Sequence, residues 1–293
     1  MSVVTWPRPR LRLKHPAQPE RAIEVFGERM NELDRLPGKG PSYRHDSPDY
    51  VMHRRDCYLD WVELTEIQLS ELTYDTAAVV ELLHTARYWE IRRLVPLDAR
   101  PVPLIDAEIR YQKDALNRLR IDLEGRLARA RGAALIAVLD TNSLLHYEPP
   151  ESIPWATIVA HSLVRLVIPL RVIEEVDAKK YSPSRRLRDR ARSVLPHIAD
   201  RVGLWGDSVP LAEGVTLEVL VEPGPRERPE DADEEILDTC RELWDFSGRP
   251  EGGVILITND IAMRLRAEAI GGIKPISLRD EYLRDKDAAH DEE

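Results

Sequence analysis

The pattern of apolar and polar positions changes character near residue 132. Before that point, apolar residues recur at spacings of three and four, which is typical of amphipathic helices. We predict helices over residues 20–36, 56–94 and 105–131. In the last of these, Leu116, Leu119 and Leu123 share one helix face. No strand pattern competes, so residues 1–132 are predicted to form an all-α N-terminal domain.

After residue 132, short apolar runs alternate with helical patterns. The runs cover residues 133–139, 163–168, 254–257 and, more weakly, 273–276, and the helical patterns cover residues 170–180, 184–202, 231–246 and 261–269. Short continuous apolar runs suit strands that are buried on both faces of a parallel sheet. Residues 215–221 instead alternate, which predicts a half-exposed strand nearer an edge. The pattern predicts a doubly wound, mostly parallel α/β domain over residues 133–284.

Three segments are predicted to lie outside regular structure. Pro, Gly and charged residues over 222–229 predict a surface loop, and residues 37–41 predict a turn. Five acids in residues 285–293 predict a disordered acidic tail. No stretch approaches the roughly 18 apolar residues that a membrane span needs, and the N-terminus lacks the apolar core of a secretory signal. We therefore expect a cytoplasmic protein without a membrane partner.

Composition narrows the chemistry. The chain has 293 residues and a formal net charge of -10. Its two cysteines, Cys57 and Cys240, lie far apart and have no metal-binding spacing, so neither a disulfide framework nor a thiolate zinc site is indicated. The motifs of dinucleotide-binding, P-loop and serine-hydrolase proteins are absent from the sequence.

Acidic residues follow two of the predicted strands directly. Asp140 comes after the run 133–139, and Asp260 comes three residues after the run 254–257. The carboxyl ends of parallel strands meet at one edge of a sheet, where functional groups gather in open α/β folds. Each aspartate is also suited to cap the helix that follows it, and this structural alternative stays open.

Helical geometry indicates which acids of two further helices can face the core or the sheet edge. At 100° per residue, Asp233 lies about 20° from the centre of the apolar stripe of its helix, whereas Asp231, Glu234, Glu235 and Asp238 lie about 120° or more away. In the helix after residue 169, Glu174 points away from the core, while Glu175 and Asp177 flank the apolar face. Asp233 is therefore predicted to be a buried-face carboxylate, and either Glu175 or Asp177 can reach the sheet edge.

Several carboxylates that converge on one place repel one another unless a cation compensates them. A hard divalent cation with oxygen ligands fits such a set, and the absence of His and Cys partners argues against zinc. One or two Mg²⁺ or Mn²⁺ ions so placed can activate water and stabilise the leaving oxygen of a phosphodiester. The set therefore predicts a Mg²⁺ or Mn²⁺ site.

Four segments together resemble the successive acidic motifs of PIN-domain nucleases. They are residues 140–146 (DTNSLLH), 167–179 (VIPLRVIEEVDAK), 233–237 (DEEIL) and 256–260 (LITND). The resemblance spans most of residues 134–280 and implies a PIN-like fold and metal-dependent hydrolysis of RNA by metal-activated water, that is, an endoribonuclease. It implies that Asp140, Glu175, Asp233 and Asp260 are the catalytic and metal-binding residues. It further implies that Asn142, Thr258 and Glu234 are accessory groups.

A basic segment follows the Glu175 helix. Residues 179–192 hold seven basic residues against one acid, in a chain that is acidic overall. Lysine and arginine side chains bind backbone phosphates, so this segment is a candidate RNA-binding surface. The residues proposed for it are Lys179, Lys180, Arg185, Arg186 and Arg188; the alternative is a solvated helix face.

Two other functions remain open. The fold can serve as a catalytically inactive RNA-binding or protein-interaction module, with the helical N-terminal domain recruiting a protein partner or forming a homo-oligomer. An aspartate after a hydrophobic strand also suggests a phosphatase of the haloacid dehalogenase type. That chemistry needs Asp-x-Asp, and here Asn142 stands at the second position.

Overall fold

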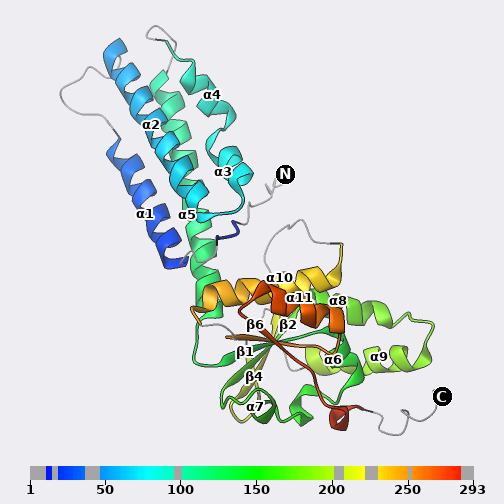
Figure 1. The fold of residues 1–293 in the computed structure, drawn as a ribbon. Coiled ribbons are helices and arrows are strands. Elements are labelled where there is room, and N and C mark those ends of the chain that lie inside the picture. Colours follow the sequence, from blue (N-terminus) through cyan, green and yellow to red (C-terminus); the bar gives the residue numbers. More distant parts are fainter. Residues whose placement is uncertain are drawn as a thin grey trace. The chain divides into compact units, whose positions relative to one another are not determined.

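The computed structural model describes residues 11–14, 19–36, 47–95, 101–200, 208–221, 230–249 and 253–284. The chain divides into two compact units, Met1–Arg129 and Ala130–Glu293, drawn in Figure 1. The predicted turn at 37–41, the predicted loop at 222–229 and the predicted acidic tail at 285–293 lie outside the described residues. No helix in the described part of the chain combines the length and apolar character of a membrane span.

The N-terminal unit is helical, as predicted. Its helices are α1 (Pro19–Arg35), α2 (Pro48–Leu72), α3 (Thr76–Leu83), α4 (Ala86–Arg92) and α5 (Pro101–Ala130) (Figure 1). The predicted segment 56–94 is thus three helices, because threonines interrupt it. The Thr73 hydroxyl donates to the Arg12 carbonyl (2.6 Å), and the Thr85 hydroxyl caps α4 by accepting from the Tyr88 amide (3.1 Å). Side chains of this type compete with the helix backbone for hydrogen bonds.

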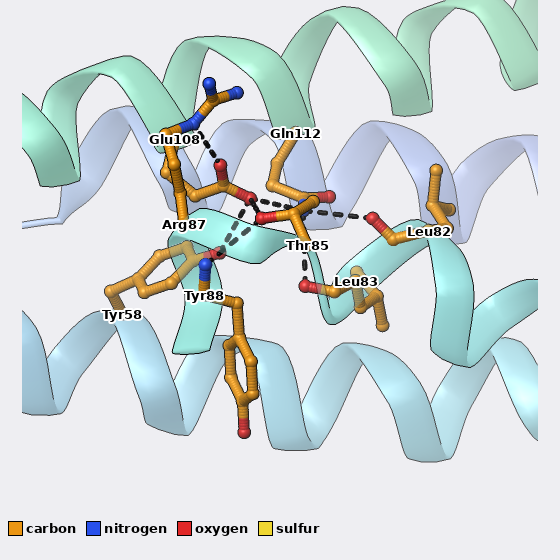
Figure 2. A network of polar contacts seen from close by, with 8 residues as sticks. All are labelled: Tyr58, Leu82, Leu83, Thr85, Arg87, Tyr88, Glu108 and Gln112. Atoms are coloured by element: carbon orange, nitrogen blue, oxygen red, sulfur yellow. Dashed lines mark hydrogen bonds and ion pairs between the residues drawn. The ribbon is translucent and has the colours of Figure 1, made fainter. Parts of the chain in front are cut away.

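A fully buried carboxylate, Glu108 of α5, joins these helices (Figure 2). Its Oε2 accepts from Arg87 Nε (2.7 Å), and its Oε1 accepts from the Thr85 hydroxyl (2.8 Å) and from Gln112 Nε2 (2.9 Å). The Tyr58 hydroxyl of α2 donates to the same Oε1 at 3.4 Å. Burial of a charge is costly unless the charge is paired and hydrogen-bonded, and here both conditions are met.

Gln112 extends this network to the end of α3. Its Nε2 also donates to the carbonyls of Leu82 (3.1 Å) and Leu83 (3.4 Å), as Figure 2 shows. The last carbonyls of a helix have no partner inside the helix, so a buried helix end needs such a donor. One polar cluster therefore ties α2, the junction of α3 and α4, and α5 together.

The Glu108→Ala variant tests this network. We expect a loss of about 3–5 kcal/mol of stability, because the change leaves buried donors without an acceptor and breaks the ion pair with Arg87. The control is Asp34→Ala, which removes an exposed ion pair with Lys113 and should cost under about 1 kcal/mol. Urea denaturation of the full chain measures both, and hydrogen exchange assigns the loss to α2–α5. Equal effects of the two variants would contradict the role given to Glu108.

The C-terminal unit is built on a six-stranded sheet of order β3-β4-β2-β1-β5-β6. The strands are β1 (Leu135–Leu139), β2 (Val164–Pro169), β3 (Val209–Ala212), β4 (Val215–Leu220), β5 (Val254–Ile257) and β6 (Ile273–Ile276). Every pairing is parallel except that of β3 with β4. The predicted fold class, a mostly parallel α/β sheet after a helical region, is confirmed.

Helices follow most of the parallel strands. They are α6 (Thr141–His146), α7 (Trp155–Ile158), α8 (Leu170–Lys179), α9 (Arg185–Ala199), α10 (Ala232–Ser247) and α11 (Ile261–Ile270), with short 3₁₀ turns at Pro150–Ser152 and Asp280–Tyr282. Figure 1 shows α10 and α11 side by side over the sheet. The core consists of the strand side chains and the apolar faces of these helices, and every residue of β1 and β5 is buried.

Two features were missed by the sequence pattern. The edge strand β3 has only four residues, contains Pro210 and is only half-buried on alternate positions, so it carries neither a continuous apolar run nor a long alternation. Proline is tolerated there because an edge strand leaves part of its backbone unpaired. The helices α6 and α7 span six and four residues, which is too short for helical periodicity to show.

Candidate active site

Asp140 and Asp260 lie at the carboxyl ends of the neighbouring strands β1 and β5, which pair with Leu139 opposite Ile257. Both aspartates cap helices, as the structural alternative predicts. Asp140 Oδ1 accepts from the Ser143 amide (2.6 Å) at the start of α6, and Asp260 Oδ1 accepts from the Met263 amide (2.8 Å) at the start of α11. Each cap uses one carboxylate oxygen, so capping and a further role are compatible.

Thr258 connects the two aspartates. It is fully buried, and its hydroxyl donates to Asp140 Oδ2 (2.5 Å). The hydroxyl oxygen of Thr258 in turn accepts from the Asp260 amide (3.1 Å). Its own amide donates to the Ile276 carbonyl of β6 (3.0 Å). The side chain of Asp140 is thereby fixed between β1 and β5.

Glu175 is the α8 acid that reaches this edge. The Thr141 hydroxyl, one residue after Asp140, donates to Glu175 Oε2 at 2.5 Å. Glu174 is exposed, as its helical position predicts. Asp177, the other residue considered for this place, is exposed and pairs with Lys180 (2.7 Å).

Asp233 lies in the first turn of α10 and is half-buried. It does not cap the helix. Asp231 does so by accepting from the Asp233 amide (3.0 Å), and Asp231 also pairs with Arg266 of α11 (3.2 Å). The carboxylate of Asp233 is therefore not used by the helix end.

Glu235 and Arg171 were missed as positioning residues. Glu235 is buried, although its helical angle predicts an outward position, and it pairs with Arg171 of α8 across 3.8 Å. Arg171 also donates to the Glu230 carbonyl (3.3 Å) ahead of α10. This pair links the start of α10 to the start of α8, which carry Asp233 and Glu175. The sequence holds no signal for it, because the pairing depends on how α8 packs against α10.

Burial and mutual repulsion affect the titration of these acids. Burial raises the pKa of Asp140 above its usual value and the charge of Asp260 raises it further, against hydrogen bonds from Ser143 and Thr258 that lower it. Burial is also the largest cause that raises the pKa of Asp233, followed by the charges of Asp231, Asp260 and Glu175, with Arg266 opposing them. Asp233 therefore lies within electrostatic range of Asp260 and of Glu175, and Asp140 lies within range of Asp260.

Within the described residues, no lysine or arginine forms an ion pair with Asp140, Glu175, Asp233 or Asp260. The described part of the chain also holds no set of three His, Cys, Asp or Glu side chains grouped closely enough to hold a metal ion. The donor chemistry itself fits Mg²⁺ or Mn²⁺, since all four groups are carboxylates, which are hard oxygen ligands.

The predicted accessory residues differ in their surroundings. Thr258 contacts Asp140 directly, whereas Asn142 and Glu234 are exposed. Thr141 and Ser143 carry the contacts expected of accessory groups, and their position beside Asp140 in the sequence is the signal that could have indicated them.

The basic segment joins α8 to α9, and two of its arginines have structural contacts. Arg188 donates to the carbonyls of Ser182 (2.7 Å) and Pro183 (2.8 Å). Arg190 is buried and lies 2.8 Å from Nδ1 of His146 on α6. Lys179, Arg185 and Arg186 are exposed, so among the residues proposed to bind RNA they are the most accessible to a ligand.

Comparison with known protein families identifies the class of this fold. Residues 137–275, which make up most of the C-terminal unit, match the PIN domain family. Proteins of this family are generally nucleases. The comparison with curated proteins finds no match.

His146 gives a prediction about pH. Burial is the main cause that lowers its pKa, followed by the charges of Arg190 and Arg186, so the folded protein favours the neutral ring. As the pH falls from about 7 to about 5, the unfolded chain binds a proton more readily than the folded one, and stability is lost. We expect His146→Gln to lose less stability over this range, measured by urea denaturation, because Gln still offers Arg190 an acceptor. An unchanged pH dependence would contradict this account.

Proposed function

We propose that the C-terminal unit is a divalent-cation-dependent ribonuclease that hydrolyses RNA phosphodiester bonds. One observation carries the proposal. Four carboxylates from separate elements come within electrostatic range around one edge of the sheet, and within the described residues no basic side chain pairs with them. Such an arrangement is unfavourable for folding alone and favourable for binding a cation.

In this proposal Asp140, Glu175, Asp233 and Asp260 hold the cation, directly or through water. A bound Mg²⁺ or Mn²⁺ supplies a lowered pKa for water and charge stabilisation at the phosphodiester. The residues of the chain supply the positions. Thr258 keeps the Asp140 carboxylate fixed, and Thr141 does the same for Glu175. The pair of Arg171 and Glu235 keeps the first turn of α10 beside α8.

Substrate phosphates are proposed to contact the basic segment. Lys179, Arg185 and Arg186 provide exposed positive charge, Lys180 adds a partly exposed ammonium group, and Arg188 mainly holds the turn between the helices. Positive charge next to the carboxylates offsets the repulsion that an acidic site exerts on RNA.

A second candidate is a PIN module that binds RNA or protein without cleaving. It is favoured by one observation, namely that no three metal-ligating side chains in the described ranges are close enough together to hold an ion. Calorimetry with Mn²⁺ separates the two. Binding at millimolar metal that is lost in Asp140→Asn supports the nuclease, and no binding to the folded protein supports the module.

The neighbouring glutamates of α8 offer a matched test of cleavage. We expect Glu175→Gln and Asp140→Asn to lower Mn²⁺-dependent cleavage of a single-stranded RNA by about 100-fold or more, because each removes a carboxylate ligand. Glu174→Gln changes an exposed glutamate of the same helix and should retain activity. Asp140→Asn should unfold at a temperature no lower than the original chain, because Asn still caps α6 and a buried charge is gone. Full activity of both site variants would defeat the proposal.

The exposed arginines provide a test of binding. We expect Arg185→Glu with Arg186→Glu to weaken RNA binding and to reduce the slope of log affinity against log salt by about 1.4, since each phosphate contact to a single strand contributes about 0.7. Arg21→Glu, an exposed arginine of α1, is the control and should leave the slope unchanged. Filter binding at several salt concentrations gives both values. An equal slope in all three proteins would indicate that the basic segment is a solvated helix face and does not bind RNA.

A further inference from the structure

We propose that Tyr181, at the turn between α8 and α9, stacks on an unpaired base of the RNA. This inference rests on the proposed function and makes the substrate more specific, because it requires a single-stranded segment beside the site of cleavage. Tyr181 is 83% exposed, the highest value among the large apolar side chains of the described residues. Its hydroxyl has no hydrogen-bond partner among those residues.

Exposure alone does not distinguish a binding residue, because isolated apolar side chains are common on protein surfaces. The turn that carries Tyr181 is, however, held by several hydrogen bonds. The Tyr181 amide donates to the Ala178 carbonyl (3.2 Å), and the Ser182 amide donates to the Lys179 carbonyl (3.1 Å). Arg188 of α9 reaches back to the carbonyls on the far side of the turn, at 2.7 and 2.8 Å.

A ring on such a turn is presented to solvent by a fixed backbone. Binding then costs little conformational entropy, because little of the chain must be ordered when a ligand arrives. The short turn between α8 and α9 can be followed in Figure 1.

Basic residues flank Tyr181 in the sequence, at the end of α8 and at the start of α9. Lys179 and Lys180 precede the tyrosine, and the Arg185 side chain, at the start of α9, is 88% exposed. Lys180 pairs with Asp177 at 2.7 Å, and Arg185 pairs with Asp189 at 3.7 Å. Both acids are exposed, and exposed ion pairs of this kind are weak. Aromatic rings next to basic side chains are the combination that binds single strands, by stacking on bases and by contacting phosphates.

Tyr181 also lies on the segment that carries one of the proposed site residues. It follows Glu175 by six residues and comes two residues after α8, the helix that contains Glu175, has ended. One helix and the turn after it thus carry both a proposed cation ligand and the ring. Bases inside a duplex are already stacked and paired, so a ring at this place selects an unpaired segment.

The test uses the full chain with Asp140→Asn, so that RNA is not cleaved, and a fluorescein-labelled 12-nucleotide oligouridylate in Mg²⁺. We expect Tyr181→Ala to weaken binding about 5- to 150-fold and Tyr181→Phe, which keeps the ring, to change it less than about 2-fold. Tyr74→Ala, an exposed tyrosine of the helical unit, is the matched control and should have no effect. Photocrosslinking of a 4-thiouridine oligonucleotide should label the peptide that contains Tyr181. A duplex of the same length should bind equally with and without the ring.

The failure of this inference can be told apart from failure of the proposed function. If the original chain cleaves RNA with Mn²⁺ while Tyr181→Ala binds the oligouridylate as well as its parent, the nuclease stands and the stacking role is wrong. If no cleavage occurs but binding still depends on the Tyr181 ring, the stacking role stands and the nuclease is wrong. An equal loss on single strand and duplex would also overturn the stacking role, because it would indicate a general structural effect.

Discussion

The cost of holding negative charge at the end of a buried parallel strand is the constraint on which the C-terminal unit depends. Asp140 follows a strand with no exposed residue, and its carboxylate is itself nearly buried. Donors from Ser143 and Thr258 lower the cost of this burial, while the nearby Asp260 raises it. The hydrogen bonds offset this cost in part, and in the proposed nuclease a bound cation would offset the remainder.

The helical unit also buries a carboxylate, but there a basic side chain pairs with it. Glu108 is as deeply buried as Asp140, but Arg87 pairs with it and three neutral donors surround it. A carboxylate satisfied in this manner serves the fold, since its removal leaves the donors unpaired. Glu108 has a cationic partner, whereas among the described residues Asp140 accepts hydrogen bonds from neutral donors only, and this difference is why the proposed nuclease uses Asp140 and not Glu108.

The hairpin of α8 and α9 brings the two kinds of charge together in the proposed nuclease. Its first helix carries Glu175 toward the strand ends, and its turn presents cations and the Tyr181 ring a few residues further on. A chain with a net charge of -10 can in this way offer RNA a local positive surface. Arg188 and Arg190 contribute to the hairpin through their contacts with the turn and with His146, so part of the basic segment serves the fold.

The sequence by itself determined the fold class and the strand-end positions of Asp140 and Asp260, because continuous apolar runs report burial on both faces of a sheet. It also narrowed the α8 acid to two residues, and the assignment of the four acids as metal ligands stays a prediction. The resemblance to PIN-domain nucleases favoured Glu175 over Asp177, and the tertiary structure adds the contact of Glu175 with the hydroxyl of Thr141. It alone revealed the buried Glu235 with its partner Arg171 and the edge strand β3. Periodicity describes which side of an element faces a core, whereas these contacts depend on which elements meet there.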